Sequence, residues 1–128
     1  MMSKEVQIII AMGSNSEAKH HIDLAKEYLT TLFKTVTFSR TKWTDPLECG
    51  ADKFLNCLAT TRSSHSLKLI TQALRSIERK CGDTIRGRKT GTVKLDLDIL
   101  CYGEEILHEQ DWERSYIKEL MKEIGYEL

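Results

Sequence analysis

Apolar and polar residues alternate with several spacings along the chain, and each spacing predicts a kind of element. Residues 5–12 (EVQIIIAM) form a short run rich in β-branched side chains, which is typical of a strand. From residue 17 to 33 apolar residues recur every three or four positions, which predicts an amphipathic helix capped by Ser16. Residues 34–43 and 53–62 again have strand character, and the segment between them contains the chain's only proline.

The second half of the chain predicts two further helices and one strand. Ser64 or Ser66 begins a second helix, whose apolar stripe ends near Gly82. A glycine-rich basic loop leads to a strand at about 92–102, and residues 112–125 return to helical spacing. The resulting order is β-α-β-β-α-β plus a C-terminal helix, so we predict a ferredoxin-like α+β fold, an antiparallel sheet with helices on one face.

Composition limits the class of protein without choosing a function. Residues 1–128 have the length of one domain, and 41% hydrophobic residues are enough to build its core. Nineteen basic and nineteen acidic residues cancel, so charge gives no reason to expect nucleic acid or a membrane as partner. The N-terminal apolar run is short and follows two charged residues, unlike a signal peptide, and no run approaches the ~20 residues of a membrane span. We expect a single, monomeric, cytoplasmic domain.

Several ligand-binding patterns fail in this sequence. The four cysteines stand far apart without a Cys-x-x-Cys pair, so we expect reduced, mostly buried thiols rather than a zinc site. Residues 82–90 (GDTIRGRKT) nearly match the phosphate-binding pattern G-x-x-x-x-G-K-[ST], but Arg88 displaces the lysine and the loop joins a helix to a strand, the reverse of the required order. The glycine turn after the first strand lacks G-x-G-x-x-G.

An aspartate pair is the strongest chemical signal. Asp96 and Asp98 alternate with aliphatic residues, so both carboxylates face one side of a strand, about 7 Å apart along it. We expect Leu100 and Tyr102 to share that face. An ordinary solvated face is one interpretation. The other is a metal site, because aspartate is a poor strand former and such a pair repels itself unless a cation or an arginine lies between. Mg²⁺, which binds one or two carboxylates plus substrate phosphates, suits it.

Basic residues precede this strand, and they also allow two interpretations. They are Arg79, Lys80, Arg86, Arg88, Lys89 and Lys94. Such a run is either a solvated charged loop or, beside a Mg²⁺-binding pair, a clamp for polyphosphate.

Strand 53–62 contributes an amide and an aromatic ring on one face. Asn56 lies between apolar residues, and a buried amide there needs hydrogen-bond partners. It either reads the polar edge of a heterocycle or bonds a neighbouring loop. Phe54 either stacks on a flat ring or packs in the core.

Taken in order, these motifs resemble the 6-hydroxymethyl-7,8-dihydropterin pyrophosphokinase family of folate biosynthesis. The resemblance covers nearly the whole chain, and LDLDIL-x-YG is its most specific part. The matching segments are IIIAMGSN at 8–15, SRTKWTDPLE from residue 39, KFLN at 53–56, Ile77–Glu78, KLDLDILCYG at 94–103 and the closing ERSYIKELMKEIGYEL. The fold that this family implies is the ferredoxin-like arrangement.

The resemblance implies a reaction and its site. Pyrophosphate would pass from ATP to the hydroxymethyl group of the pterin, releasing AMP; the alternative is a weakened or inactive homologue that binds a pterin or nucleotide. By match of position, Asp96 and Asp98 would be catalytic and hold two Mg²⁺ ions. The implied pterin contacts are Thr44, Leu47, Phe54, Asn56 and Tyr116, with the two rings sandwiching the pterin. Glu78 and Arg114 would lie at the nucleotide.

The chain also departs from the family pattern before the aspartate strand. Thr90, Thr92 and Val93 stand where the family has Trp, Pro and Arg, and Asp83 stands where it has Arg. The following segment is shorter, and His108 does not align with the family's Pro-His. Our hypothesis is that nearby basic residues replace the missing nucleotide clamps. These are Arg86, Arg88, Lys89 and Lys94, of which Arg86 and Arg88 would have catalytic roles. A nucleic-acid module is disfavoured, since no aromatic RNA-binding motif occurs.

Overall fold

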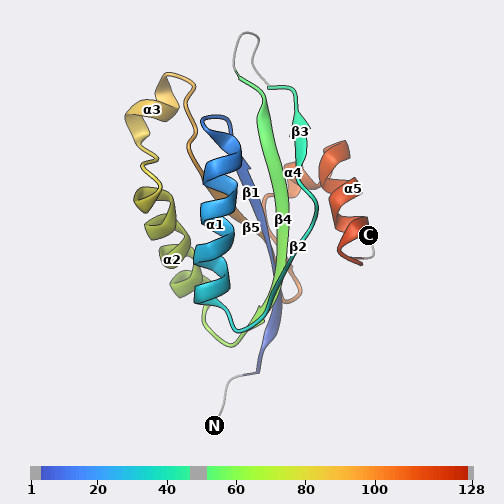
Figure 1. The fold of residues 1–128 in the computed structure, drawn as a ribbon. Coiled ribbons are helices and arrows are strands. Elements are labelled where there is room, and N and C mark those ends of the chain that lie inside the picture. The colour runs from blue at the N-terminus through green and yellow to red at the C-terminus, as the bar shows by residue number, and fades with distance from the viewer. Residues whose placement is uncertain (1–3, 47–51, 127–128) are drawn as a thin grey trace.

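The computed structural model describes residues 4–46 and 52–126. Its elements are, in order, β1 (Val6–Ser14), α1 (Ala18–Leu32), β2 (Val36–Phe38), β3 (Lys42–Thr44), β4 (Phe54–Ser63), α2 (Leu67–Lys80), α3 (Ile85–Lys89), β5 (Asp96–Tyr102), β6 (Glu105–Ile106), α4 (Glu109–Trp112) and α5 (Ser115–Glu123) (Figure 1).

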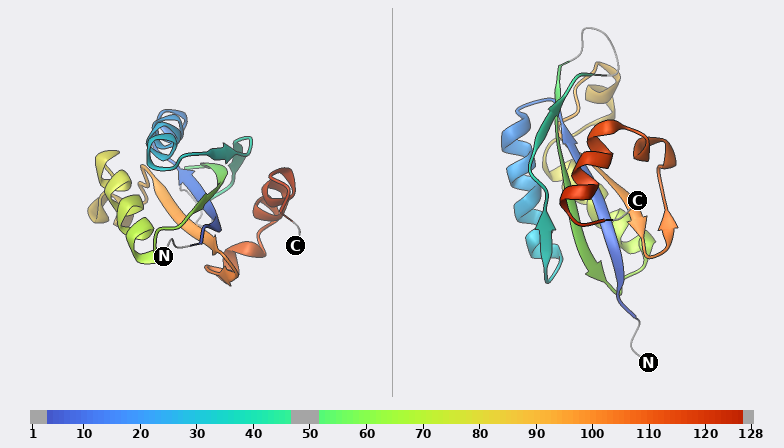
Figure 2. Two further views of the ribbon diagram at one scale, coloured as in Figure 1. Left: turned by 90° about the horizontal axis from the view of Figure 1, so that it is seen from below. Right: turned by 90° about the vertical axis from the view of Figure 1, so that its right-hand side faces the viewer.

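One antiparallel sheet organises the chain. Its strand order is β2-β4-β1-β5-β6, and β3 pairs with the other end of β4. Helices α1 and α2 cover one face of the sheet, and α5 lies across the other (Figure 2). The predicted ferredoxin-like α+β fold with a C-terminal helix is confirmed. None of the helices among the described residues has the length and apolar character needed to cross a membrane.

Both faces of the sheet are buried. The larger apolar cluster lies between the sheet and the helices α1 and α2 and includes Ile8, Leu29 and Leu97. The opposite face forms a second cluster with α4 and α5, made by Ile9, Leu58, Leu100, Cys101, Trp112, Ile117, Leu120 and Met121. The C-terminal helix is therefore part of the core, and its position is fixed by apolar contact.

Local signals set both ends of α2 but not the start of α1. Ser66 caps α2 by accepting the Leu69 N–H at 3.1 Å, and Gly82 follows the helix with a φ of 85°, as a C-terminal glycine should. The predicted cap at Ser16 is wrong, because α1 begins after Glu17, which adopts a left-handed conformation without a side-chain cap bond.

The predicted strand at 34–43 is two strands, β2 and β3. Phe38 pairs with Ala59 and Lys42 pairs with Asn56, so three residues on this edge lie opposite two on β4. Ser39 causes the interruption, since its hydroxyl accepts the Leu58 N–H at 2.8 Å in place of a backbone carbonyl. The bulge leaves both short strands paired with β4.

A second bulge, in β5, changes the face on which Tyr102 lies from the one predicted. Ile9 pairs with Cys101 but Ile10 pairs with Ile99, so Leu100 is an extra residue in β5. Leu100 shares the face of the aspartates, as predicted, and joins the second cluster. Tyr102 does not, because the bulge returns it to the face of α1 and α2.

The C-terminal segment and the basic loop contain more structure than predicted. The expected helix at 112–125 divides into α4 and α5, and the basic loop includes the short helix α3. Cys57, Cys81 and Cys101 are buried and free, as predicted. Cys49 and Leu47 lie outside the described residues.

We predict that Leu120→Ala lowers the free energy of unfolding by about 2–5 kcal/mol, because it removes a fully buried side chain from the second cluster. Urea denaturation followed by circular dichroism measures this change. Lys122→Ala, at an exposed position on α5, is the control and should cost less than about 0.5 kcal/mol. Equal losses in the two variants would contradict the packing described here.

Candidate active site

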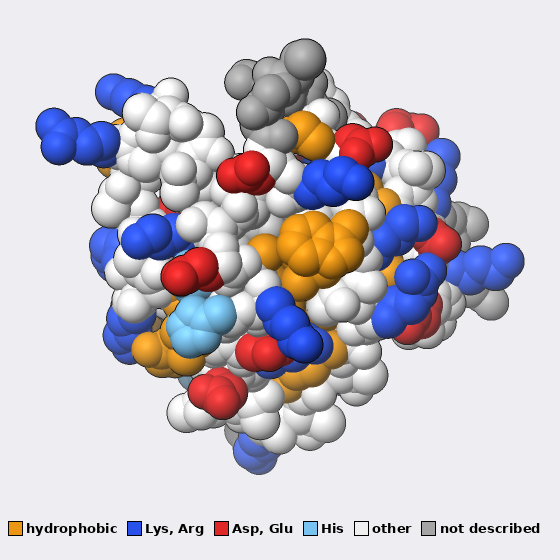
Figure 3. All heavy atoms as spheres, turned by 45° about the horizontal axis from the view of Figure 1, so that its top comes forward, with side chains coloured by type: hydrophobic (Ala, Val, Ile, Leu, Met, Phe, Trp, Pro, Cys, Tyr) orange, Lys and Arg blue, Asp and Glu red, His pale blue; other side chains and the backbone are white. Residues whose placement is uncertain are grey.

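A cleft of about 350 Å³ opens at one end of the sheet. It lies where the end of β1, the end of β3 and the starts of β4 and β5 meet the start of α5. The lining includes Gly13, Thr44, Phe54, Asp96 and Tyr116, one from each of these elements. From this end, apolar side chains lie at the centre, and acidic, basic and histidine side chains surround them (Figure 3).

One side of the cleft joins an amide to two aromatic rings. Phe54, Asn56 and Tyr116 all line it. The Asn56 Nδ2 group donates to the Thr44 hydroxyl at 2.8 Å and to the Lys42 carbonyl at 3.1 Å. Among the described residues no donor bonds its Oδ1, which faces Gly13. Bonding to β3 therefore fixes the amide and leaves an acceptor free.

Arg114 and Tyr116 form a pair at the start of α5. The Arg114 guanidinium carbon lies 4.8 Å from the centroid of the Tyr116 ring, within cation–π range. Burial raises the pKa of the Tyr116 hydroxyl, an effect that Arg114 opposes and nearby carboxylates reinforce. The hydroxyl is therefore protonated at neutral pH, and the ring presents a neutral face to the cleft.

The aspartates stand on the opposite side of the cleft. Asp96 and Asp98 both line it, on the face of β5 predicted for them. Burial and, after it, the charge of Asp96 raise the pKa of Asp98 to about 6, and His108 and Arg75 oppose the rise. The repulsion expected from the sequence is thus present, and the surrounding cations offset only part of it.

Two arginines and one buried glutamate brace this strand. Arg75 donates to Glu78 at 2.5 Å and to the Leu97 carbonyl at 3.0 Å, and its other nitrogen lies 3.5 Å from Asp98. Glu78 is buried and accepts the Leu97 N–H at 2.7 Å. It is absent from the cleft lining, so its carboxylate supports the strand from behind.

Arg88 is the member of the basic segment that reaches the cleft. It lies 3.3 Å from Asp96 and 2.5 Å from Asp83, and it donates to the Leu95 carbonyl at 3.0 Å. Asp83 also accepts the Lys94 N–H at 2.9 Å, which gives this departure from the family a structural role. The side chains predicted to act beside Arg88, those of Arg86 and Lys89, are exposed and do not line the cleft.

Asn15 ties the basic segment to the end of β1. Its Nδ2 donates to the Gly91 carbonyl at 2.8 Å, and its Oδ1 accepts the Val93 N–H at 2.7 Å. This closure positions residues 91–93 along the cleft. Asn15 ends the IIIAMGSN segment, but the sequence did not predict it as a site residue.

The sequence interpretation also missed Arg75, His108 and Asp111. Arg75 and Glu78 are three apart on a helix, where opposite charges meet, so this contact was visible in the sequence. His108 lies 3.9 Å from Asp98, and Asp111 lines the cleft. The positions of His108 and Asp111 beside the aspartates depend on the path of β6 and α4, which the spacing of residues in the sequence does not predict.

Fold and cleft together define an α+β protein whose cleft places aromatic rings beside paired carboxylates. A family model described as 7,8-dihydro-6-hydroxymethylpterin-pyrophosphokinase (HPPK) matches residues 9–126, and the chain belongs to this family. It is 31% identical over 127 residues to the folate synthesis bifunctional protein of Arabidopsis thaliana. That alignment covers 87% of this chain and 25% of the relative, so the chain spans about a quarter of that protein's length.

The raised pKa of Asp98 predicts a pH-dependent stability in metal-free protein. Because the folded state holds the proton more tightly, stability falls as pH rises from the ordinary value of 3.8 through about 6. Asp98→Asn removes this loss, so its stability relative to the parent should grow by up to about 3 kcal/mol between these limits. Urea unfolding in EDTA across this range measures the difference.

The matched control is Asp23→Asn, which changes an exposed aspartate on α1. It should show no comparable trend. A difference between Asp98→Asn and the parent that stays constant with pH would contradict the environment described for Asp98.

Proposed function

We propose that the protein transfers pyrophosphate from ATP to the hydroxymethyl group of 6-hydroxymethyl-7,8-dihydropterin and releases AMP. The observation that carries the proposal is the single cleft in which Asp96 and Asp98 face Phe54, Asn56 and Tyr116. A flat heterocycle and a metal-bound polyphosphate need these two kinds of surface next to each other. Membership of the pyrophosphokinase family and the similarity to a folate synthesis protein support it.

The pterin would lie between Phe54 and Tyr116. Offset stacking on two rings holds a planar ligand in one orientation. The free Oδ1 of Asn56 would accept a hydrogen bond from an N–H at the polar edge of the pterin, and Thr44 would fix the amide in that orientation. Leu47 remains a proposed contact of the same edge. These interactions would bring the hydroxymethyl oxygen toward the aspartate side of the cleft.

The phosphates of ATP would lie over the aspartates. Two carboxylates whose mutual repulsion is only partly offset are suitable ligands for a hard divalent cation. Asp96 and Asp98 would hold two Mg²⁺ ions, which when bound neutralise the charge of the ATP phosphates and of the group being transferred. We expect the chain to act as a monomer on these small molecules.

Several side chains would position the reacting groups. Arg88 reaches the cleft and would donate to phosphate oxygens after exchanging its contact with Asp96. Arg114 lies at the opposite rim, beside the ring of Tyr116. Glu78 and Arg75 would act through the strand, because both bond the backbone of Leu97 between the aspartates. Arg86 and Lys89 would add positive charge near the nucleotide without bonding it.

A pterin- or nucleotide-binding homologue without turnover is the second candidate. The observation in its favour is that Arg88 already bonds Asp83 and Asp96, so the clamp must break an existing network to reach a phosphate.

We predict that the purified protein releases AMP from ATP only when both Mg²⁺ and the pterin are present. Asp96→Asn and Asp98→Asn should each lower this rate by about 100-fold or more, because each removes a ligand that places charge beside the transferred group. Chromatographic quantification of AMP measures the rate. Asp23→Asn is the charge-matched control and should keep the parent rate.

Two results would contradict the proposed transfer. One is AMP release that does not depend on the pterin. The other is the absence of AMP at high enzyme concentration from folded protein that still binds the pterin, which would favour the binding homologue.

We also predict different roles for the basic residues of α3. Arg88→Gln should weaken binding of a non-hydrolysable ATP analogue with Mg²⁺ by about tenfold or more, because a charge-assisted hydrogen bond is lost. Arg86→Gln and Lys89→Gln should each change it by less than about threefold at ~0.15 M salt, since exposed charges are screened. Isothermal titration calorimetry measures all three, and similar losses in the three variants would contradict this division.

A further inference from the structure

We propose that Asp98, His108 and Asp111 form a second metal site, which takes a divalent transition ion such as Zn²⁺ in preference to Mg²⁺. This inference goes beyond the proposed transfer reaction and does not need a pterin or a nucleotide. It differs from the Asp96–Asp98 pair in two of its three ligands, and Asp98 is common to both.

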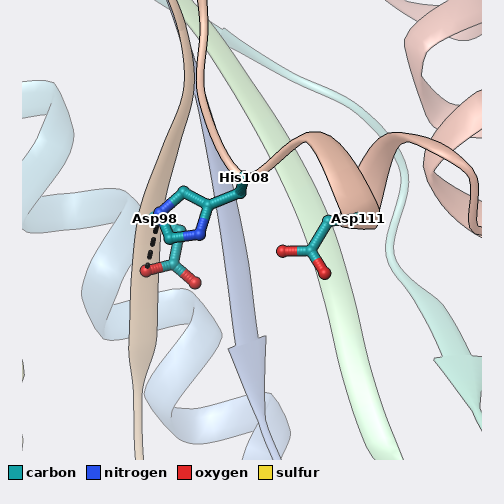
Figure 4. A group of neighbouring side chains, drawn as sticks. All are labelled: Asp98, His108 and Asp111. Atoms are coloured by element: carbon teal, nitrogen blue, oxygen red, sulfur yellow. Dashed lines mark ion pairs between the residues drawn. The ribbon is translucent and has the colours of Figure 1, made fainter.

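The three side chains converge from two segments of the chain. Asp98 comes from β5, and His108 and Asp111 come from the segment that follows β6 (Figure 4). One ligand atom from each residue lies within 4.8 Å of the other two. His108 Nε2 lies 3.9 Å from Asp98 Oδ1. The imidazole and both carboxylates therefore enclose a space in which a single ion contacts all of them.

The backbone fixes these two segments relative to each other. The Leu107 N–H donates to the Leu100 carbonyl at 3.0 Å, next to His108 and two residues from Asp98. The Trp112 indole N–H donates to the Leu107 carbonyl at 3.0 Å. The Asp111 N–H donates to the His108 carbonyl at 2.8 Å, which closes one helical turn and places the two side chains on the same side of it.

The distances between the ligand atoms of the three residues are longer than in a metal-bound site, and small side-chain movements would shorten them enough. Zinc binds imidazole nitrogen and carboxylate oxygen at about 2.0–2.2 Å, so tetrahedral ligands lie about 3.4 Å apart. The required approach is within reach of side-chain rotation, because the His108 side chain is 47% exposed. Solvent would complete the coordination, as it does in open zinc sites with three protein ligands.

The imidazole determines which ions fit. Mg²⁺ favours oxygen ligands and usually keeps several waters, whereas Zn²⁺ binds imidazole strongly. An ion bound to all three residues occupies Asp98 and thereby competes with Mg²⁺ on the aspartate pair. Zn²⁺ and Mg²⁺ should therefore compete for binding at this edge of the cleft.

Isothermal titration of the reduced, untagged full chain with ZnCl₂ alone tests the site. The expected result is one Zn²⁺ per chain, weakened by about tenfold or more in His108→Ala and in Asp111→Asn. His65→Ala, which removes an exposed histidine elsewhere and leaves its backbone bonds in place, should alter the affinity by less than about twofold. Thermal melts by circular dichroism check that each variant folds.

Two further measurements separate this site from the proposed Mg²⁺ pair. Asp96→Asn should abolish AMP release but keep zinc affinity within about fivefold, because Asp96 is not a ligand of the second site. NMR should show zinc shifting the ring signals of His108, while those of His20, His21 and His65 stay in place. Zinc affinity unchanged in both ligand variants, or lost equally in His65→Ala, would overturn the proposal, as would ring shifts confined to the other histidines.

Discussion

The repulsion between two carboxylates on β5 is the constraint on which this structure depends. Asp96 and Asp98 share one face of a strand whose other face is core, so neither can turn away from its neighbour. Arg75 and Arg88 reach them from α2 and α3, and burial still raises the pKa of Asp98 to about 6. A bound cation would offset the cost of holding unneutralised charge in the cleft. Glu78 pairs with both arginines from behind the strand, so part of their positive charge is already used and they offset the charge of the aspartates only in part.

Two irregularities in the sheet, at Leu100 and at Ser39, determine which side chains lie on the face of the aspartates and beside Asn56. The extra residue Leu100 in β5 puts its own side chain and that of Cys101 on the face that meets α5, and it returns Tyr102 to the opposite face. On the far edge, Ser39 breaks the ladder, and β3 resumes with Thr44 beside Asn56. A sheet with regular pairing throughout would change which side chains meet at these two points. The two bulges lie on opposite sides of the central strands β4 and β1.

The sequence predicts those parts of this molecule that depend on local spacing. Strict alternation placed Asp96 and Asp98 on one face, and the capping preference of serine placed the start of α2 at Ser64 or Ser66, of which Ser66 is the cap. Contacts between distant segments did not follow from such patterns. The return of Tyr102 to the opposite face needs the bulge, and the approach of His108 to Asp98 needs the turn after β6. Sequence spacing predicts which face of a strand or helix a side chain occupies. These contacts depend instead on how separate elements are arranged relative to one another.

The second apolar cluster also affects how the chain matures. Leu58 and Leu100 are covered by the helix that carries Tyr116 at its start, so the aromatic wall of the cleft and the cover of the sheet are one element. A nascent chain in which that helix has not docked exposes the apolar residues of the second cluster and lacks the Tyr116 side of the cleft. Such a species is prone to aggregation. Docking of α5 therefore buries this apolar surface and positions the Tyr116 ring in one step.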